Sequence, residues 1–185
     1  MVPITTLWLP VLVSAVLVFV ASSVIHMFTP WHKGDRRGVP GEEEAMAALR
    51  RLKLPPGDYV MPYATSMEAM KSPEFVARLD AGPAVLMTVW KGTTSMTGSL
   101  LGWFVYSIVV GVFSGYLAGA ALPVGASYLE VFRFAGTTAF AGYALAVPHQ
   151  SIWWKQNWGT TMRTMIDGLL YGCLTAGTFG WLWPR

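Results

Sequence analysis

The stretch SIVVGVFSGYLAG, residues 107–119, is the part of the sequence around which the rest of the chain is expected to be organised. Within it, four small residues recur at every fourth position: Ser107, Gly111, Gly115 and Gly119. Residues four apart lie on one face of a helix, so the spacing predicts a ridge without side-chain bulk. A glycine inside a helix in water costs about 1 kcal/mol relative to alanine, whereas small residues in a bilayer let helices approach closely. The stretch therefore predicts a membrane-spanning helix that packs through this ridge.

A second ridge follows near the C-terminus. Its members are again four apart: Gly168, Gly172, Ala176 and Gly180. Because two helices carry such a face, we expect each to seek a close partner, which is either the other ridge or a second chain.

The composition also indicates a membrane protein. Of the 185 residues, 54% are hydrophobic and 12% are charged, whereas soluble domains carry about 25% charged residues. The nine Trp and seven Tyr residues suit a protein with two membrane–water interfaces. The single cysteine, Cys173, excludes an intrachain disulfide and a multi-cysteine metal site. A net charge of +3 does not favour nucleic acid as a partner.

Four segments are predicted to cross the bilayer: 4–29, 96–122, 126–148 and 160–183. The first contains no Lys, Arg, Asp or Glu and exceeds the roughly 20 residues that a crossing needs. A signal peptide is the alternative for this segment, but the basic start and the cleavage site of small residues are both absent. Residues 149–158, between the last two spans, are expected to lie at a membrane interface as an amphipathic connector.

Residues 32–91 hold most of the charge and are expected to fold as a small insertion. A helix is predicted over 40–53, because glutamates crowd its start and basic residues its end. Ser72 and Pro73 are typical of the start of a second, short helix. Residues 59–63 and 84–90 favour strands and are predicted to pair as a two-stranded ribbon.

Basic residues in the loops predict the orientation in the membrane. They concentrate in 32–91 and at Lys155, so these parts are expected in the cytoplasm, with both termini and the turn at 123–125 outside. The predicted fold class is an all-α integral membrane protein with four transmembrane helices and a small cytoplasmic α(+β) insertion between helices 1 and 2.

Four charged residues fall inside the predicted spans: Glu130, Arg133, Arg163 and Asp167. Their spacings of three and four place Glu130 with Arg133, and Arg163 with Asp167, on common helix faces, which predicts two intramembrane ion pairs. Charges at such positions are costly and typical of function. We interpret them as self-neutralising pairs that orient helices, with ion or proton movement through Asp167 and Arg163 as the alternative.

The three histidines, His26, His32 and His149, fall at the ends of helices on the predicted cytoplasmic side. Converging imidazoles, joined by Asp35 or by a glutamate from 42–44, would form a ligand set for zinc or a similar metal. A haem or pigment bound through His26 and His149 is a further reading. Histidines that hydrogen-bond to headgroups or backbone are the simpler interpretation, so no cofactor is assigned.

Three stretches carry a resemblance to a known group of proteins: SSVIHMFTPWHKGD at 22–35, LPPGDYVMPYA at 54–64 and GPAVLMTVW at 82–90. In this order they resemble a family of uncharacterised small bacterial inner-membrane proteins. The resemblance implies a bacterial source and a location in the inner membrane. It implies no activity and no site residue.

The sequence contains no nucleophile elbow, phosphate-binding loop or haem attachment motif, so we do not expect an enzyme. We expect a structural or accessory subunit of a larger membrane assembly, or a homo-oligomer, whose partners are the lipid bilayer and other membrane subunits. The first alternative is a small oligomeric transporter or channel that uses Asp167 and Arg163. The second is a membrane protein that binds a metal or cofactor through His26, His32 and His149.

Overall fold

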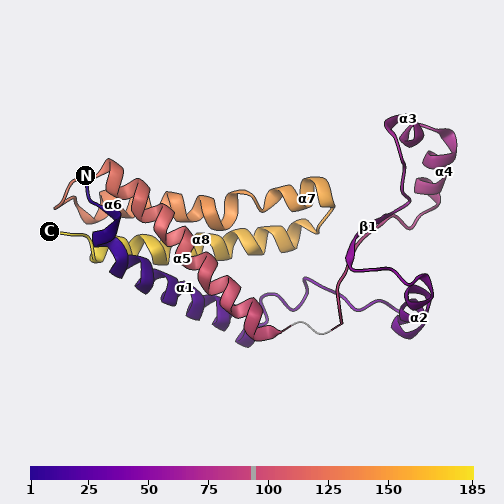
Figure 1. The fold of residues 1–185 in the computed structure, drawn as a ribbon, viewed down its shortest axis with the longest axis horizontal. Coiled ribbons are helices and arrows are strands. Elements are labelled where there is room, and N and C mark those ends of the chain that lie inside the picture. The colour runs from indigo at the N-terminus through magenta and orange to yellow at the C-terminus, as the bar shows by residue number, and fades with distance from the viewer. Residues whose placement is uncertain (93–94) are drawn as a thin grey trace. The chain divides into compact units, whose positions relative to one another are not determined.

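The computed structural model describes residues 1–92 and 95–185 and is mostly helical. It divides into two compact units, the first made of residues 1–37 and 95–185, and the second of residues 38–94. The first unit holds the long helices, and the second holds short helices and a small sheet (Figure 1).

Four helices of the first unit form a closed ring. Helix α1 (Trp8–Phe28), which follows the short 3-10 helix η1 (Ile4–Leu7), contacts α5 (Met96–Ala121) and α8 (Trp158–Trp181). Helix α6 (Tyr128–Phe140) contacts the same two helices from the other side. Each helix therefore has two neighbours, and the small and apolar faces meet inside the ring.

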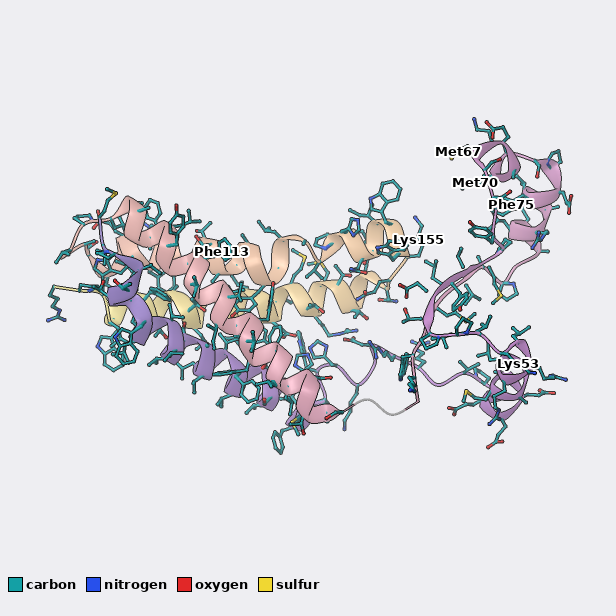
Figure 2. All side chains as sticks on the ribbon, in the orientation of Figure 1. Lys53, Met67, Met70, Phe75, Phe113 and Lys155 are labelled. Carbon is teal, nitrogen blue, oxygen red and sulfur yellow. The ribbon has the colours of Figure 1, made fainter. Side chains whose placement is uncertain are left out.

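Within the described residues, two helical segments are long and apolar enough to cross a membrane, Ile4–Phe28 and Met96–Ala121. Their outward faces carry large apolar side chains, including Phe113 of α5, which is 60% exposed (Figure 2). The third and fourth predicted spans also contain helices, but α6 ends after 13 residues and α8 carries Arg163 and Asp167.

The two chain termini meet the turn between α5 and α6 at one end of the ring (Figure 1). The backbone N–H of Val2 donates to the carbonyl of Gly119 at 2.8 Å, and the N–H of Gly125 donates to the carbonyl of Pro184 at 2.9 Å. The indole of Trp183 donates to a carbonyl of the same turn at 3.0 Å. These bonds close this end of the bundle without a further element.

The ridge of α5 packs against the N-terminal part of the chain. A Cβ added at Gly111 would meet Val11 of α1 at 3.3 Å, and one added at Gly119 would collide with the backbone carbonyl of Val2. The ridge positions are all buried: Ser107, Gly111, Gly115 and Gly119. Close approach to α1 and η1 therefore requires the absence of side chains on this face.

The ridge of α8 packs against α6 and the π-helical turn η2 (Ala141–Leu145). A Cβ at Gly168 would meet Ala144 at 2.8 Å, and one at Gly180 would meet the ring of Tyr128 at 2.7 Å. The middle members, Gly172 and Ala176, are buried against α6. Each ridge thus meets a different part of the same chain, rather than the other ridge.

The third helical segment differs from its prediction at its end. Pro148, expected to end the helix, begins α7 (Pro148–Trp154) instead, because the first turn of a helix has no partner for an N–H and accepts proline. The connector expected at 149–158 is therefore largely helical. Its buried Ser151 and Thr161 of α8 are hydrogen-bonded at 2.5 Å.

The second unit contains α2 (Glu42–Leu52), α3 (Met67–Met70) and α4 (Pro73–Ala81) with one antiparallel strand pair. Strand β1 (Gly57–Met61) pairs with β2 (Val85–Val89), which confirms the predicted ribbon. The hydroxyl of Ser72 accepts from the N–H of Phe75 and caps α4. Among the described residues 38–92, Phe75, labelled in Figure 2, is the one buried side chain.

Candidate functional site

The candidate site lies at the end of α1, where residues 29–37 run beside α8. Two consecutive turns shape this segment, since the N–H of Lys33 donates to the carbonyl of Pro30 and the N–H of Asp35 to that of His32, both at 3.1 Å. The turns place Trp31, His32 and Asp35 against α8, where they meet Arg163 and Asp167.

Asp167 is the buried member of the site, with 4% of its surface exposed. Nε2 of His32 bonds to its Oδ2 at 2.6 Å, and the indole N–H of Trp31 donates to its Oδ1 at 3.0 Å. Both carboxylate oxygens are therefore engaged, which offsets the cost of removing this group from water.

His32 lies between two carboxylates. Its Nδ1 is 2.6 Å from Oδ2 of Asp35, while its Nε2 faces Asp167 at the same distance. Burial by itself lowers the pKa of His32, but the hydrogen bonds and charges of Asp35 and Asp167 outweigh it, and the pKa lies above its ordinary value. A ring that donates from both nitrogens is an imidazolium, so the segment 29–37 is attached to α8 by a charged link.

Asp35 connects this histidine to Arg163. Nε of Arg163 donates to Oδ1 of Asp35 at 2.7 Å, and a terminal nitrogen of the same guanidinium bonds to the same oxygen. Burial raises the pKa of Asp35, but the hydrogen bonds and charges of His32 and Arg163 outweigh it and hold the pKa below its usual value. The two carboxylates and two cations alternate along one chain of contacts and balance in charge.

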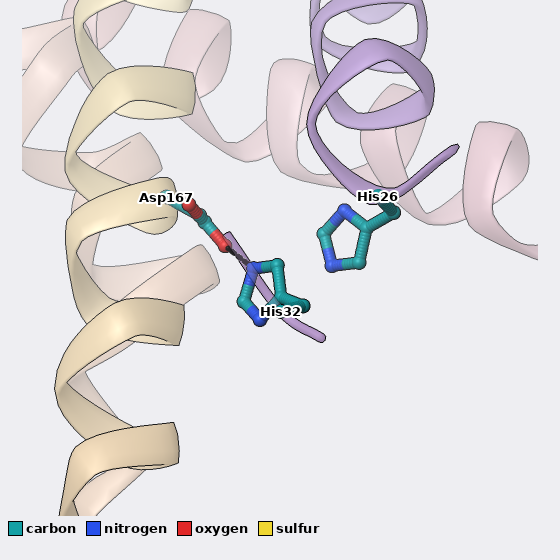
Figure 3. A group of neighbouring side chains, drawn as sticks. All are labelled: His26, His32 and Asp167. Carbon is teal, nitrogen blue, oxygen red and sulfur yellow. Dashed lines mark hydrogen bonds and ion pairs between the residues drawn. The ribbon is translucent and has the colours of Figure 1, made fainter. Parts of the chain in front are cut away.

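His26, in the last turn of α1, stacks on His32 with ring centroids 4.4 Å apart and planes inclined by 10°. Its Nδ1 is 3.0 Å from the carbonyl oxygen of Ser22. A carbonyl only accepts, so Nδ1 donates to it, and Nε2 is the ring nitrogen left for another partner. One ligand atom each from His26, His32 and Asp167 lies within 4.8 Å of the others (Figure 3).

The site is reached from outside through an open polar groove of about 740 Å³. His26, His32 and Asp35 line one side, and residues near the start of α8, among them Asn157 and Thr160, line the other. A small hydrated ion can approach the two imidazoles by this route.

Neither predicted intrahelical ion pair forms. Among residues 1–92 and 95–185, Arg163 pairs with Asp35 and Asp167 with His32, so α8 uses its charges to hold the segment after α1. The physical reason is burial. Asp167 faces the inside of the four-helix bundle, where partners from another segment surround it, while Arg163 lies one turn nearer the start of α8.

Glu130 also has a different partner from the one predicted. Its carboxylate accepts from the N–H and the hydroxyl of Ser127 at 2.9 and 2.7 Å, which forms a capping box at the start of α6. The cap satisfies N–H groups at the helix start that have no partner within the helix, whereas an exposed pair with Arg133 contributes little.

Of the three histidines proposed as ligands, the structure brings two together. His26 and His32 share the cluster with Asp167, whereas His149 lies at the start of α7 with its ring near Trp154. No sequence pattern indicated Trp31 as a partner of Asp167, or the backbone of Ser22 as a partner of His26. The spacing of His32 and Asp35, three apart in a turn, was the available signal for their pairing.

Comparison of the chain with protein-family models, with curated proteins and with solved structures gives no match. The function is therefore inferred from the geometry of this site and from the helices that carry it.

Proposed function

We propose that this chain is a four-span integral membrane protein, with the insertion at 32–91 in the cytoplasm, that holds a divalent metal ion of the zinc class at His26, His32 and Asp167. The membrane part is supported by two helices of sufficient length and apolar character, and by the bundle's connectivity. Both termini and the α5–α6 turn lie at one end, as an even number of crossings requires.

The single observation that carries the metal site is that each candidate ligand is oriented by a second group on its other polar atom. Nδ1 of His26 is held by a carbonyl, Nδ1 of His32 by Asp35, and Oδ1 of Asp167 by the indole of Trp31. Metal-binding histidines characteristically donate their second N–H to a carbonyl or a carboxylate in this way. Of the remaining atoms, Nε2 of His32 and Oδ2 of Asp167 face each other at 2.6 Å, and the ring of His26 is stacked on that of His32.

The ligand set suits zinc or a neighbouring transition metal. Two imidazole nitrogens and one carboxylate oxygen leave a fourth position for water. Ligands about 2.0–2.1 Å from Zn²⁺ lie roughly 3.3 Å apart in a tetrahedron, while the three atoms here lie within 4.8 Å of one another. To hold the ion, Nε2 of His32 and Oδ2 of Asp167, now 2.6 Å apart, would separate by roughly 0.7 Å. The exposed ring of His26 would turn out of its stack on His32, and the ion would take the place of the proton between His32 and Asp167.

Zinc titration of the purified protein in mild detergent tests this proposal. The wild-type chain is expected to bind one Zn²⁺, and His26→Ala is expected to bind it at least tenfold more weakly. His149→Ala is the matched control, because it removes an exposed histidine of the same chain that lies outside the cluster. Equal losses in the two variants, or a wild-type chain that does not bind zinc, would overturn the proposal.

A role as an accessory subunit is the second candidate, and one observation favours it. The described residues of the second unit bury a single side chain and leave many large apolar ones exposed, among them Met46, Leu52 and Met67. Apolar surface of this kind is typical of a contact with another protein. Replacing Met46 and Leu52 with Ser should release a bound partner from the protein isolated out of native membranes, while zinc binding is retained.

A further inference from the structure

Arg133 is an exposed cation in the second turn of α6. The acid predicted to pair with it, Glu130, instead caps the helix through Ser127. Among the described parts of the chain, the ion pairs involve His32, Asp35, Arg163 and Asp167, so no carboxylate bonds directly to Arg133 there, and Glu130 acts on it only as a more distant charge. A guanidinium in this position favours an anion from outside the protein.

Two grooves flank Arg133, one on each side of α6. The groove between α5 and α6 has a volume of about 570 Å³ and is lined by Leu117, Ala121 and Phe134. The groove between α6 and α8 has a volume of about 260 Å³ and is lined by Phe140, Leu169 and Cys173. Arg133 and Thr137, one turn apart on α6, line both grooves and separate them.

We infer that Arg133 binds the phosphate of an anionic two-chain phospholipid, with one acyl chain in each groove. A guanidinium recognises phosphate oxygens through two parallel hydrogen bonds. The apolar linings of the grooves match acyl chains, and the single cation between them matches one headgroup. A free anion such as inorganic phosphate would leave both grooves without an occupant.

The depth of Arg133 fits a headgroup. It lies five residues after Tyr128, and a helix rises about 1.5 Å per residue, so it lies roughly 7–8 Å along the axis from the start of α6. Large aromatic side chains at this end, Tyr128 and Trp181, are 48% and 79% exposed and are typical of a membrane interface. The long side chain of arginine reaches the headgroup layer from such a depth.

This inference rests on the proposed membrane location and is independent of the metal site. The two failures are distinguishable: a protein that alkaline carbonate strips from membranes contradicts the membrane location, whereas a protein that stays in membranes without lipid preference contradicts the lipid site alone.

The test is native mass spectrometry of the full chain from mixed bilayers of phosphatidylglycerol and phosphatidylcholine. The wild type is expected to retain one phosphatidylglycerol per chain, at least tenfold more often than phosphatidylcholine. Arg133→Gln should abolish this preference, and Arg133→Lys should keep part of it. Arg185→Gln changes the net charge equally at the C-terminus and should keep all of it.

A second variant tests the two-groove geometry. Ala121→Trp fills the groove between α5 and α6, so it should weaken binding of the two-chain lipid at least tenfold and leave a single-chain lysophospholipid bound through the other groove. Equal retention of the two lipid classes by the wild type, or equal effects of Arg133→Gln and Arg185→Gln, would overturn the inference. If Ala121→Trp does not fold, the comparison of the two arginine variants still decides it.

Discussion

Asp167 of α8 faces Nε2 of His32 at 2.6 Å, although 135 positions separate the two residues in the chain. This contact joins the segment after the first helix to the last helix and places two histidines and a carboxylate together. The metal site proposed above depends on it, because without it His26 would be an isolated, exposed imidazole.

Asp35→Asn should weaken zinc binding without unfolding the protein. The carboxylate of Asp35 holds Nδ1 of His32, and loss of such a supporting group typically costs 10–100-fold in metal affinity. Competition with a fluorescent chelator measures the change. Asp58→Asn is the control, because Asp58 accepts from Thr88 at 2.6 Å in the second unit. An Asp35→Asn variant with wild-type affinity would mean that Asp35 does not support a ligand.

Gly119→Ala should destabilise the bundle by about 1–3 kcal/mol, the usual cost of overpacking. A methyl group there collides with the backbone carbonyl of Val2, which cannot rotate away as a side chain does. Gly102→Ala, in the same helix, has nothing within 4 Å of the added carbon and should change stability by no more than about 0.5 kcal/mol. Thermal unfolding in detergent, followed by circular dichroism, compares the two. Equal melting temperatures would show that α5 does not pack on the N-terminal segment.

Ser22→Ala should cost about 1 kcal/mol, because it leaves a partly buried indole N–H without a partner. The hydroxyl of Ser22 accepts from Nε1 of Trp103 at 2.7 Å and joins α1 to α5. Ser23→Ala is the matched control, since the Ser23 hydroxyl bonds within its own helix to the carbonyl of Phe19. In detergent, the free energy of unfolding of Ser23→Ala should be close to that of the wild type, and that of Ser22→Ala should be lower. A Ser22→Ala variant as stable as Ser23→Ala would contradict this contact.

Single cysteines should report opposite sides of the membrane at the two ends of the bundle. In a Cys173→Ser background, Gly34→Cys lies in the segment after α1, where an added Cβ meets no atom within 4 Å, and Val124→Cys lies at an exposed position of the turn after α5. A membrane-impermeant maleimide applied to intact cells is expected to label Val124→Cys and to label Gly34→Cys only after lysis. Labelling of both from outside would contradict the four-span topology.

The patterns that depend on one helix alone were readable from the sequence. The spacing of four residues between Ser107, Gly111 and Gly115 predicted a helix face without large side chains. That face of α5 packs against the N-terminal part of the chain. The turn residues around Ser72 predicted the start of α4 for the same local reason. Neither pattern specifies a partner, and so the helix that covers each ridge followed only from the tertiary structure.

The site was readable only in part, because its contacts join distant segments. The spacing of Arg163 and Asp167 favoured a pair within α8, yet burial of Asp167 brings His32 and Trp31 to it from the segment after α1. Sequence spacing indicates which residues are neighbours on one helix. It gives no information about a segment distant in the sequence that folds back onto that helix. His26 and His32 were selected as ligands by residue type, and His149 was selected with them for the same reason although it lies elsewhere.

X-ray absorption at the zinc edge of the purified protein, loaded with one equivalent of Zn²⁺, identifies the ligand atoms of the proposed metal site. A site at His26, His32 and Asp167 gives a first shell of nitrogen and oxygen at about 2.0–2.1 Å, with outer-shell scattering from two imidazoles that falls to one in His26→Ala. A shell containing sulfur at about 2.3 Å, or zinc without imidazole, would contradict it.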